Sequence, residues 1–174
     1  MIAALSAICV VTWAVQAALP VDWHPVVAPL EQQPLMVRMD AKGSGQFNAP
    51  RSGNRRHRGV DLEAPVGSPV RAVRSGRVVK ARRHRGLGRY VELAHRHGLY
   101  TLYAHLDTVL VKEGARIQQG QIIATVGKTG NARSRLIKSH LHFEVHHKGQ
   151  PVDPGTLGLA FVPAKELAPT HVDD

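Results

Sequence analysis

The segment His140-Leu141-His142-Phe143-Glu144-Val145 decides how this chain can fold and what it can do. Polar and apolar residues alternate in it with a period of two, which is typical of a β-strand with one buried face. On such a strand the two histidines and the glutamate share one face. The Cα atoms of neighbouring members of this set, two residues apart in the chain, are about 6–7 Å apart. One imidazole could then bind a metal ion while its neighbour contacts a water or substrate on that ion.

A single His-x-His pair is more often a solvated strand face, and two further segments strengthen the metal hypothesis. His57-Arg58-Gly59-Val60-Asp61 places an imidazole and a carboxylate four residues apart, on one side of an extended chain. Gly59 between them leaves room for a close approach. Tyr103-Ala104-His105-Leu106 adds another imidazole after the apolar run 99–102. Together these side chains are suited to a metal-assisted reaction.

In this order, the three segments resemble the motifs of the lysostaphin/LytM-type zinc metallopeptidases, peptidase family M23. The connecting segments 65–70, 75–79 and 114–130 are similar to the family as well, so the resemblance covers roughly residues 43–154. It implies the cofactor Zn²⁺ and an activity, the hydrolysis of peptide cross-links in bacterial peptidoglycan.

The resemblance also implies a role for each matching residue. The zinc ligands would be His57, Asp61 and His142, and the catalytic histidines would be His105 and His140. Three protein ligands leave a fourth position for water, whose pKa zinc lowers toward neutrality. One catalytic histidine would take a proton and the other would assist, and the sequence does not assign these two roles.

Three features near the motifs leave their roles open. Tyr103 is expected to be a packing residue, with an oxyanion donor as the alternative. Glu144 either orients an imidazole or is an exposed strand carboxylate. The segment 131–139 departs from the family, whose corresponding loop is short and rich in glycine and serine. Here it lacks glycine and carries three basic residues, and it borders the predicted cleft, so the substrate preference stays open.

Other motifs have simpler interpretations. His95-Arg96-His97-Gly98 is also His-x-His, but it lies between two strand-like runs and is better explained by a hairpin turn with Gly98 at an unusual backbone angle. His84 lies in the basic run 80–85, which is expected to be a solvated loop. No His-Glu-x-x-His motif is present, which excludes a helix-based zincin.

Residues 43–154 show a pattern of short strands separated by glycine and proline. We expect strands at 68–73, 76–81, 90–94, 99–106, 121–126 and 140–145. The fold class predicted from them is all-β, a single antiparallel β-sheet domain of the lysostaphin/LytM type.

The 174 residues are enough for one such domain with extensions. Residues 1–19 are mostly apolar and are expected to be a signal peptide or membrane anchor, although no lysine or arginine precedes the run. Residues 20–42 contain four prolines and are expected to be a Pro-rich linker. The metallopeptidase domain would cover 43–154, and 155–174 would be a loosely packed C-terminal tail.

The net charge of +10 favours an anionic partner. Aromatic residues make up only 5% and no nucleic-acid-binding motif is present, so nucleic acid is not expected as a partner. We expect an exported zinc endopeptidase, in the periplasm or cell envelope, with peptidoglycan as its partner. The alternatives are a non-catalytic LytM-like activator of cell-wall amidases and a peptidase that cuts proteins. The bond cut and the oligomeric state stay open.

Overall fold

The computed structural model describes residues 25–164, so the apolar segment 1–19 lies outside the described part. Strands, turns and short 3-10 helices make up this part, and no α-helix occurs in it. The strands are β1 Leu35–Val37, β2 Met39–Asp40, β3 Gly43–Ser44, β4 Pro50–Arg51, β5 Arg55–Arg56, β6 Val60–Glu63, β7 Pro69–Arg71, β8 Gly76–His84, β9 Gly88–Ala94, β10 Leu99–Val109, β11 Arg116–Ile117, β12 Ile122–Val126, β13 His140–His147, β14 Gln150–Val152 and β15 Phe161–Pro163. The 3-10 helices are η2 Arg96–Gly98, η3 Gly130–Arg133 and η4 Pro154–Leu157.

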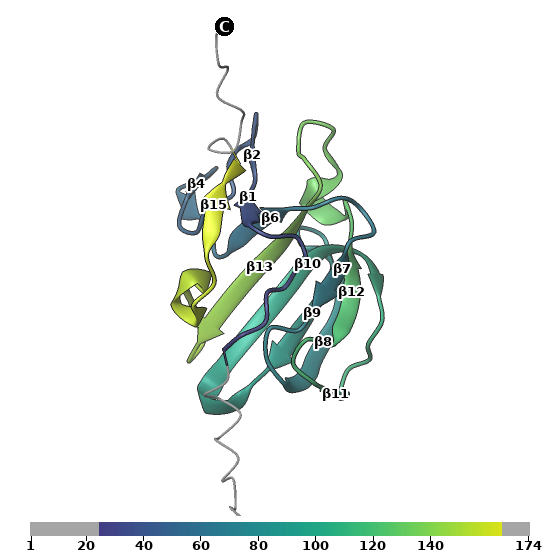
Figure 1. Cartoon of the computed structure of the whole chain (residues 1–174). Coiled ribbons are helices and arrows are strands. Elements are labelled where there is room, and N and C mark those ends of the chain that lie inside the picture. The colour runs from purple at the N-terminus through teal and green to yellow at the C-terminus, as the bar shows by residue number, and fades with distance from the viewer. Residues whose placement is uncertain (1–24, 165–174) are drawn as a thin grey trace, which may run out of the picture.

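One mostly antiparallel sheet of eleven strands forms the body of the molecule (Figure 1). Its main path runs β11-β8-β9-β10-β13-β6-β1-β15, so β13 lies between β10 and β6 near the middle. Among the described strands, the one parallel pairing joins β1 to β15. The predicted all-β fold with an antiparallel sheet is therefore confirmed, with this parallel pair added at one edge.

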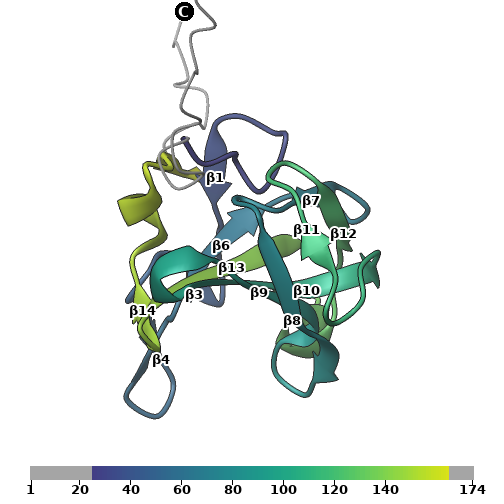
Figure 2. The same ribbon diagram turned by 90° about the horizontal axis from the view of Figure 1, so that it is seen from below.

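The long strand β10 belongs to both parts of the sheet. It pairs with β9 and β13 along its first half, and its second half pairs with β12. Strand β12 in turn pairs with β7, and Figure 2 shows this part of the sheet from below. The two parts enclose the hydrophobic core between them.

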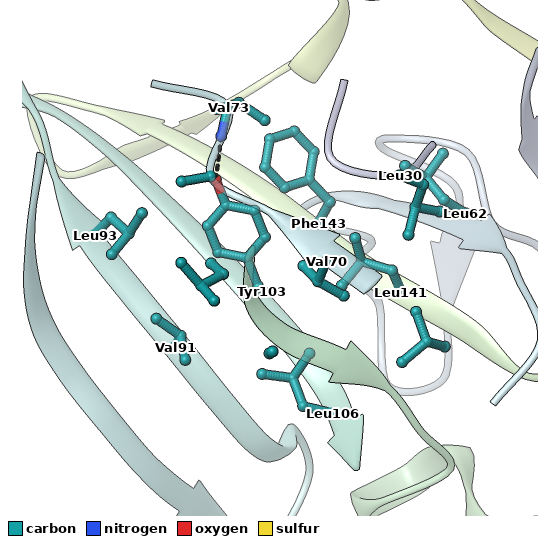
Figure 3. Close-up of a cluster of buried hydrophobic side chains, with 14 of the residues drawn as sticks. Leu30, Leu62, Val70, Val73, Val91, Leu93, Tyr103, Leu106, Leu141 and Phe143 are labelled. Atoms are coloured by element: carbon teal, nitrogen blue, oxygen red, sulfur yellow. Dashed lines mark hydrogen bonds between the residues drawn. The ribbon is translucent and has the colours of Figure 1, made fainter. Parts of the chain in front are cut away.

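The apolar face of β13 supplies the centre of that core (Figure 3). Leu141, Phe143 and Val145 are each fully buried, as the alternation in the sequence predicted. The Phe143 ring lies 5.3 Å from the ring of Tyr103, centroid to centroid. The Tyr103 hydroxyl accepts a hydrogen bond from the Val73 amide at 3.0 Å, and burial raises the pKa of this phenol to about 12. Tyr103 is thus a packing residue, as expected.

The six expected strands are all present, and one expectation beside them is wrong. The basic run 80–85 was expected to be a solvated loop, but β8 continues through it as far as His84, which pairs with Gly88 of β9. Its side chains are exposed, so solvation was anticipated correctly. Exposed charged side chains are compatible with regular pairing near the edge of a sheet, and the composition alone could not reveal this.

Two short strands of the main sheet lie in the segments that were expected to flank the domain. Strand β1 falls within residues 20–42, with Leu35 and Val37 buried in the core. Strand β15 falls within residues 155–174, where Phe161 pairs with Leu35. The packed sheet therefore draws on residues before 43 and after 154. None of the helices within residues 25–164 is long and apolar enough to cross a membrane.

Candidate metal centre

Three neighbouring strands bring distant motifs together on the polar face of the sheet. In the β6–β13 pair Asp61 lies opposite His142, although the two residues are 81 positions apart. In the β13–β10 pair His142 lies opposite Ala104, the residue before His105. Hydrogen bonding between strands thus fixes which side chains meet. With His57 in the segment that leads into β6, all five residues that the sequence singled out line one cavity.

Three of these residues place their ligand atoms in one small cluster. Asp61 Oδ1 lies 2.8 Å from His142 Nδ1 and 3.1 Å from His57 Nε2, and the two ring nitrogens are 3.1 Å apart. All three residues are buried, and they form the group that could hold a metal ion in the described part of the chain. Two imidazole nitrogens and one carboxylate oxygen are a donor set that suits Zn²⁺ with an open fourth position.

A second contact holds each of these three side chains on its far side. The His57 Nδ1 hydrogen donates to the Gln46 carbonyl at 2.7 Å, which directs Nε2 into the cluster. Glu144 Oε1 lies 2.8 Å from His142 Nε2, and it orients that ring in the same way. Arg38 Nη2 donates to Asp61 Oδ2 at 3.0 Å. Such outer contacts fix the tautomer and direction of a ligand before a metal binds.

The contacts also set the charges in the cluster. Burial alone would raise the pKa of Asp61, but hydrogen bonds from His142 and His57 hold it well below its usual range. Burial alone would lower the pKa of His142, but hydrogen bonds to Asp61 and Glu144 raise it to about 9. The two carboxylates are therefore ionised, and a metal cation at His142 Nδ1 would replace a proton there.

His105 and His140 form a second pair beside the cluster. Their ring centroids are 4.9 Å apart, and His140 Nε2 lies 3.7 Å from Asp61 Oδ1. Each ring donates its Nδ1 hydrogen to a backbone carbonyl, His105 to Thr129 at 2.9 Å and His140 to Lys138 at 2.7 Å. Nε2 is thus left as the acceptor in both rings. Burial, together with the nearby His142 and His140, lowers the pKa of His105 to about 3, and burial also lowers that of His140. Two neutral imidazoles are thus available as proton acceptors.

An irregularity in β10 aims His105 into the site. Tyr103 and Leu106 are both fully buried in the core, although residues three apart in a regular strand face opposite sides. The pairing of β10 with β9 shifts between Tyr103 and Leu106, and His105 has a left-handed φ of 62°. This bulge inserts one residue and turns His105 to the polar face. Backbone strain of this kind is concentrated at functional sites.

A cavity of about 1280 Å³ extends over the polar face of the sheet. All five predicted site residues line it: His57, Asp61, His105, His140 and His142. The unusual segment 131–139 borders it, as expected, through Asn131, Ala132 and Ile137. A cavity of this size exceeds that of most small-molecule sites and fits an extended chain.

The space beside Gly59 serves the fold and not an incoming molecule. A Cβ there would lie 2.3 Å from the Phe143 carbonyl oxygen and 2.8 Å from Glu144 Cγ, so the neighbouring strand fills the gap.

Glu144 is only 6% exposed, which excludes the interpretation as an exposed strand carboxylate. Its other oxygen lies 2.5 Å from His146 Nε2.

Sequence reasoning missed Arg38, because it lies in the segment expected to be a linker. The guanidinium is buried and forms a second ion pair at 2.5 Å with Asp40. A signal was available: residues 35–40 lack glycine and proline and begin with Leu-Met-Val, a composition that favours a strand. Nothing in the sequence indicated that Arg38 would contact Asp61.

Comparisons with known proteins agree with this geometry. Residues 55–154 match the model of Peptidase family M23. The chain is 42% identical over 97 residues to the peptidoglycan DD-endopeptidase ShyB of Vibrio cholerae, a match that covers 56% of this chain and 22% of ShyB. It is 38% identical over 116 residues to the murein hydrolase activator NlpD of Salmonella dublin, covering 66% and 29%. The chain thus spans less than a third of either relative.

Solved structures show the same fold. A zinc-containing peptidase from Vibrio cholerae superposes with a TM-score of 0.56 at 35% identity, over 74% of this chain and 37% of that one. The catalytic domain of lysostaphin from Staphylococcus simulans superposes with a TM-score of 0.58 at 31% identity, over 67% of this chain and 90% of that domain. The predicted lysostaphin-type fold is confirmed.

Proposed function

We propose, from the premise that the chain belongs to peptidase family M23, that it is a zinc-dependent endopeptidase acting on the peptide cross-links of bacterial peptidoglycan. One observation carries this proposal. A complete donor cluster and two neutral histidines lie together on the wall of a cavity large enough for an extended peptide. The relative ShyB, a peptidoglycan DD-endopeptidase, supports the substrate class.

Each residue of the site has a role in this proposal. His57, Asp61 and His142 would hold the zinc ion, which suits their donor atoms and their outer contacts. When bound, zinc supplies a Lewis acid that polarises a carbonyl and lowers the pKa of a water molecule. His105 and His140 present acceptor nitrogens to the same space, so one would take the proton of the attacking water and the other would stabilise developing charge.

A non-catalytic role is the second candidate, because the chain is also similar to the murein hydrolase activator NlpD. The site argues against it. An activator that does not cut needs neither the ligand cluster nor paired proton acceptors, and here all five side chains are buried and held by second contacts.

The proposed substrate also indicates where in the cell the protein acts. Peptidoglycan lies outside the cytoplasmic membrane, so we propose that the protein is exported to the periplasm or cell envelope. The apolar run 2–19 would then act as signal or membrane tether, and it lies outside the described residues.

Digestion of cross-linked peptidoglycan tests the function. The purified zinc-loaded protein should convert cross-linked muropeptide dimers to monomers, and mass spectrometry of the products would identify the bond. A chelator and the variant His140→Ala should each abolish the conversion. Zinc bound without any cleavage would contradict the endopeptidase and direct attention to amidase activation, which an added amidase would reveal.

A further inference from the structure

The cavity wall carries far more positive than negative charge. Seven lysine and arginine side chains line it, against three carboxylates. The seven are Arg38, Lys42, Arg51, Arg55, Arg56, Arg58 and Lys80, and the three are Asp61, Glu92 and Glu144. Positive charges therefore outnumber negative charges on the cavity wall, and not every cation can pair with a carboxylate there.

The three carboxylates already have partners. Asp61 accepts from Arg38 at 3.0 Å and contacts the two histidines of the ligand cluster. Glu92 lies 2.8 Å from Lys80 Nζ. Glu144 is held between His142 and His146. All three carboxylates of the wall are therefore already paired, and Arg38 and Lys80 are the cations that pair with two of them.

Five cations remain, and we call them the basic rim: Lys42, Arg51, Arg55, Arg56 and Arg58. The contacts of the arginines are mainly with uncharged oxygens. Arg51 donates to the Ser44 carbonyl at 3.0 Å, Arg55 donates to the Ser52 carbonyl at 3.0 Å, and Arg56 donates to the Asn48 carbonyl at 3.4 Å. The closest carboxylate contact of the rim is Arg51 Nη2 to Asp61 Oδ2, at 3.5 Å. Carbonyls do not neutralise a guanidinium, so this positive charge is left for something in the cavity.

The rim residues come from one stretch of the chain, residues 42–58, which also contains the predicted ligand His57. Arg51 and Arg55 belong to the hairpin of β4 and β5, and this hairpin leads directly into His57. Arg58 follows His57 in the chain, and Lys42 lies in the turn between β2 and β3. On another part of the wall, the segment 131–139 contributes Asn131, Ala132 and Ile137, none of which is charged. A peptide in the cavity would therefore meet basic groups from residues 42–58 and uncharged groups from residues 131–139.

We propose that the basic rim is a carboxylate-binding subsite that makes this site selective for acidic peptides. Free carboxylates of the wall peptide would contact the rim arginines, whose planar donor pairs match a carboxylate. The proposal rests on the peptidoglycan substrate proposed above, and it adds a chemical requirement: carboxylates that are converted to carboxamides should weaken binding.

A matched pair of ligands tests the subsite without any need for cleavage. Two fluorescent cross-linked wall peptides would be used, identical except that one has free side carboxylates and the other has carboxamides at the same positions. Fluorescence anisotropy with the zinc-loaded His140→Ala chain would give both affinities. We expect the acid form to bind about tenfold more tightly at low salt, with a smaller difference at high salt.

Variants in the same background locate the effect. The triple substitution Arg55→Gln/Arg56→Gln/Arg58→Gln should bring the two affinities within about twofold. The corresponding lysine triple keeps the charge but lacks the planar donor pairs, so it should retain only part of the preference. The control Arg77→Gln/Lys112→Gln/Arg116→Gln removes the same charge from exposed positions outside the cavity and should keep the preference. Thermal unfolding and zinc content would verify that each variant is folded.

The outcomes separate the two proposals. Equal affinity for the acid and the amide, absent binding of both, or an equal loss in the control triple would overturn the carboxylate subsite. Cleavage of the same peptides by the unsubstituted chain reports independently on the endopeptidase. If the acid is preferred in binding but neither form is cut, the subsite stands and the catalytic proposal fails.

Discussion

Two His-x-His segments of this chain have very different surroundings. His140 and His142 lie on β13 in the middle of the sheet, buried beside Asp61. His95 and His97 lie at the connection of β9 and β10, where η2 contains His97 at a φ of 56° and ends at Gly98 with a φ of 70°. The turn predicted for 95–98 is thus confirmed. The same three-residue pattern serves chemistry in one place and a chain reversal in the other.

The difference comes from the neighbouring strands. His142 faces Asp61 because β6 pairs with β13 in a register that sets them opposite each other. His95 Nδ1 instead donates to the Ser75 carbonyl at 2.9 Å, and its Nε2 lies 2.8 Å from Thr101 Oγ1. Both ring nitrogens of His95 are thus engaged in structural contacts. A histidine pair becomes a metal centre only where another strand supplies a carboxylate and leaves a ring nitrogen available.

The largest expected effect is the loss of zinc when a ligand of the candidate site is removed, while the other His-x-His segment is not needed for zinc binding. Replacing His142 with alanine removes one of three donors, so zinc content should fall from about one per chain to near zero, and peptidoglycan cleavage should fall to background. His95→Ala should retain full zinc content. Metal analysis after dialysis measures both. Zinc loss in the His95 variant, or its retention in the His142 variant, would show that the two pairs are assigned wrongly.

A second expectation separates roles within the functional pair. His105→Ala and His140→Ala should each lower kcat by about 10²–10⁴-fold, the contribution of a positioned proton-transfer group, with zinc content unchanged. Steady-state kinetics on a cross-linked muropeptide, beside metal analysis of the same samples, distinguishes this from ligand loss. A variant that loses zinc in proportion to activity would identify its histidine as a ligand.

A smaller effect is expected at the outer contact of His142. Glu144→Gln keeps the size of the side chain but removes the charge that orients the ring, so zinc affinity should fall by about 10–100-fold. Competition with a chromogenic chelator measures this affinity. Glu113→Gln removes the same charge from an exposed position outside the cavity, so it serves as the charge-matched comparison and should leave the affinity unaltered. An unchanged affinity in Glu144→Gln would reduce this residue to a packing role.

The smallest effect concerns the structural pair. His95→Ala loses the contacts to Ser75 and Thr101, and we expect the free energy of unfolding to fall by about 1–2 kcal/mol. Arg96→Ala, at an exposed position between the two histidines, should change it by less than about 0.5 kcal/mol. Urea denaturation of the zinc-loaded chain gives both values. Equal changes in the two variants would mean that the His95 contacts contribute no stability.

Much of the fold could be read from local patterns. The alternation in 140–145 predicted which side chains of β13 enter the core, because residues of a strand point to opposite faces in turn. The same rule gives the wrong side for His105, since regular alternation from Tyr103 would bury it in the core. The bulge that redirects it depends on how β10 pairs with β9 and β12, and no local pattern specifies those pairings.

The sequence by itself determined the all-β architecture, the family resemblance and the five residues that the candidate site uses. Only the tertiary structure decided that β1 joins the sheet and that Arg38 and Glu144 hold the ligands. It also decided that the rim cations line one cavity, where their closest carboxylate contact is at 3.5 Å. The physical reason is the separation along the chain of the residues that interact. Periodicity and motif chemistry act between residues close in the chain, whereas burial, ion pairing and strand register depend on partners many positions away.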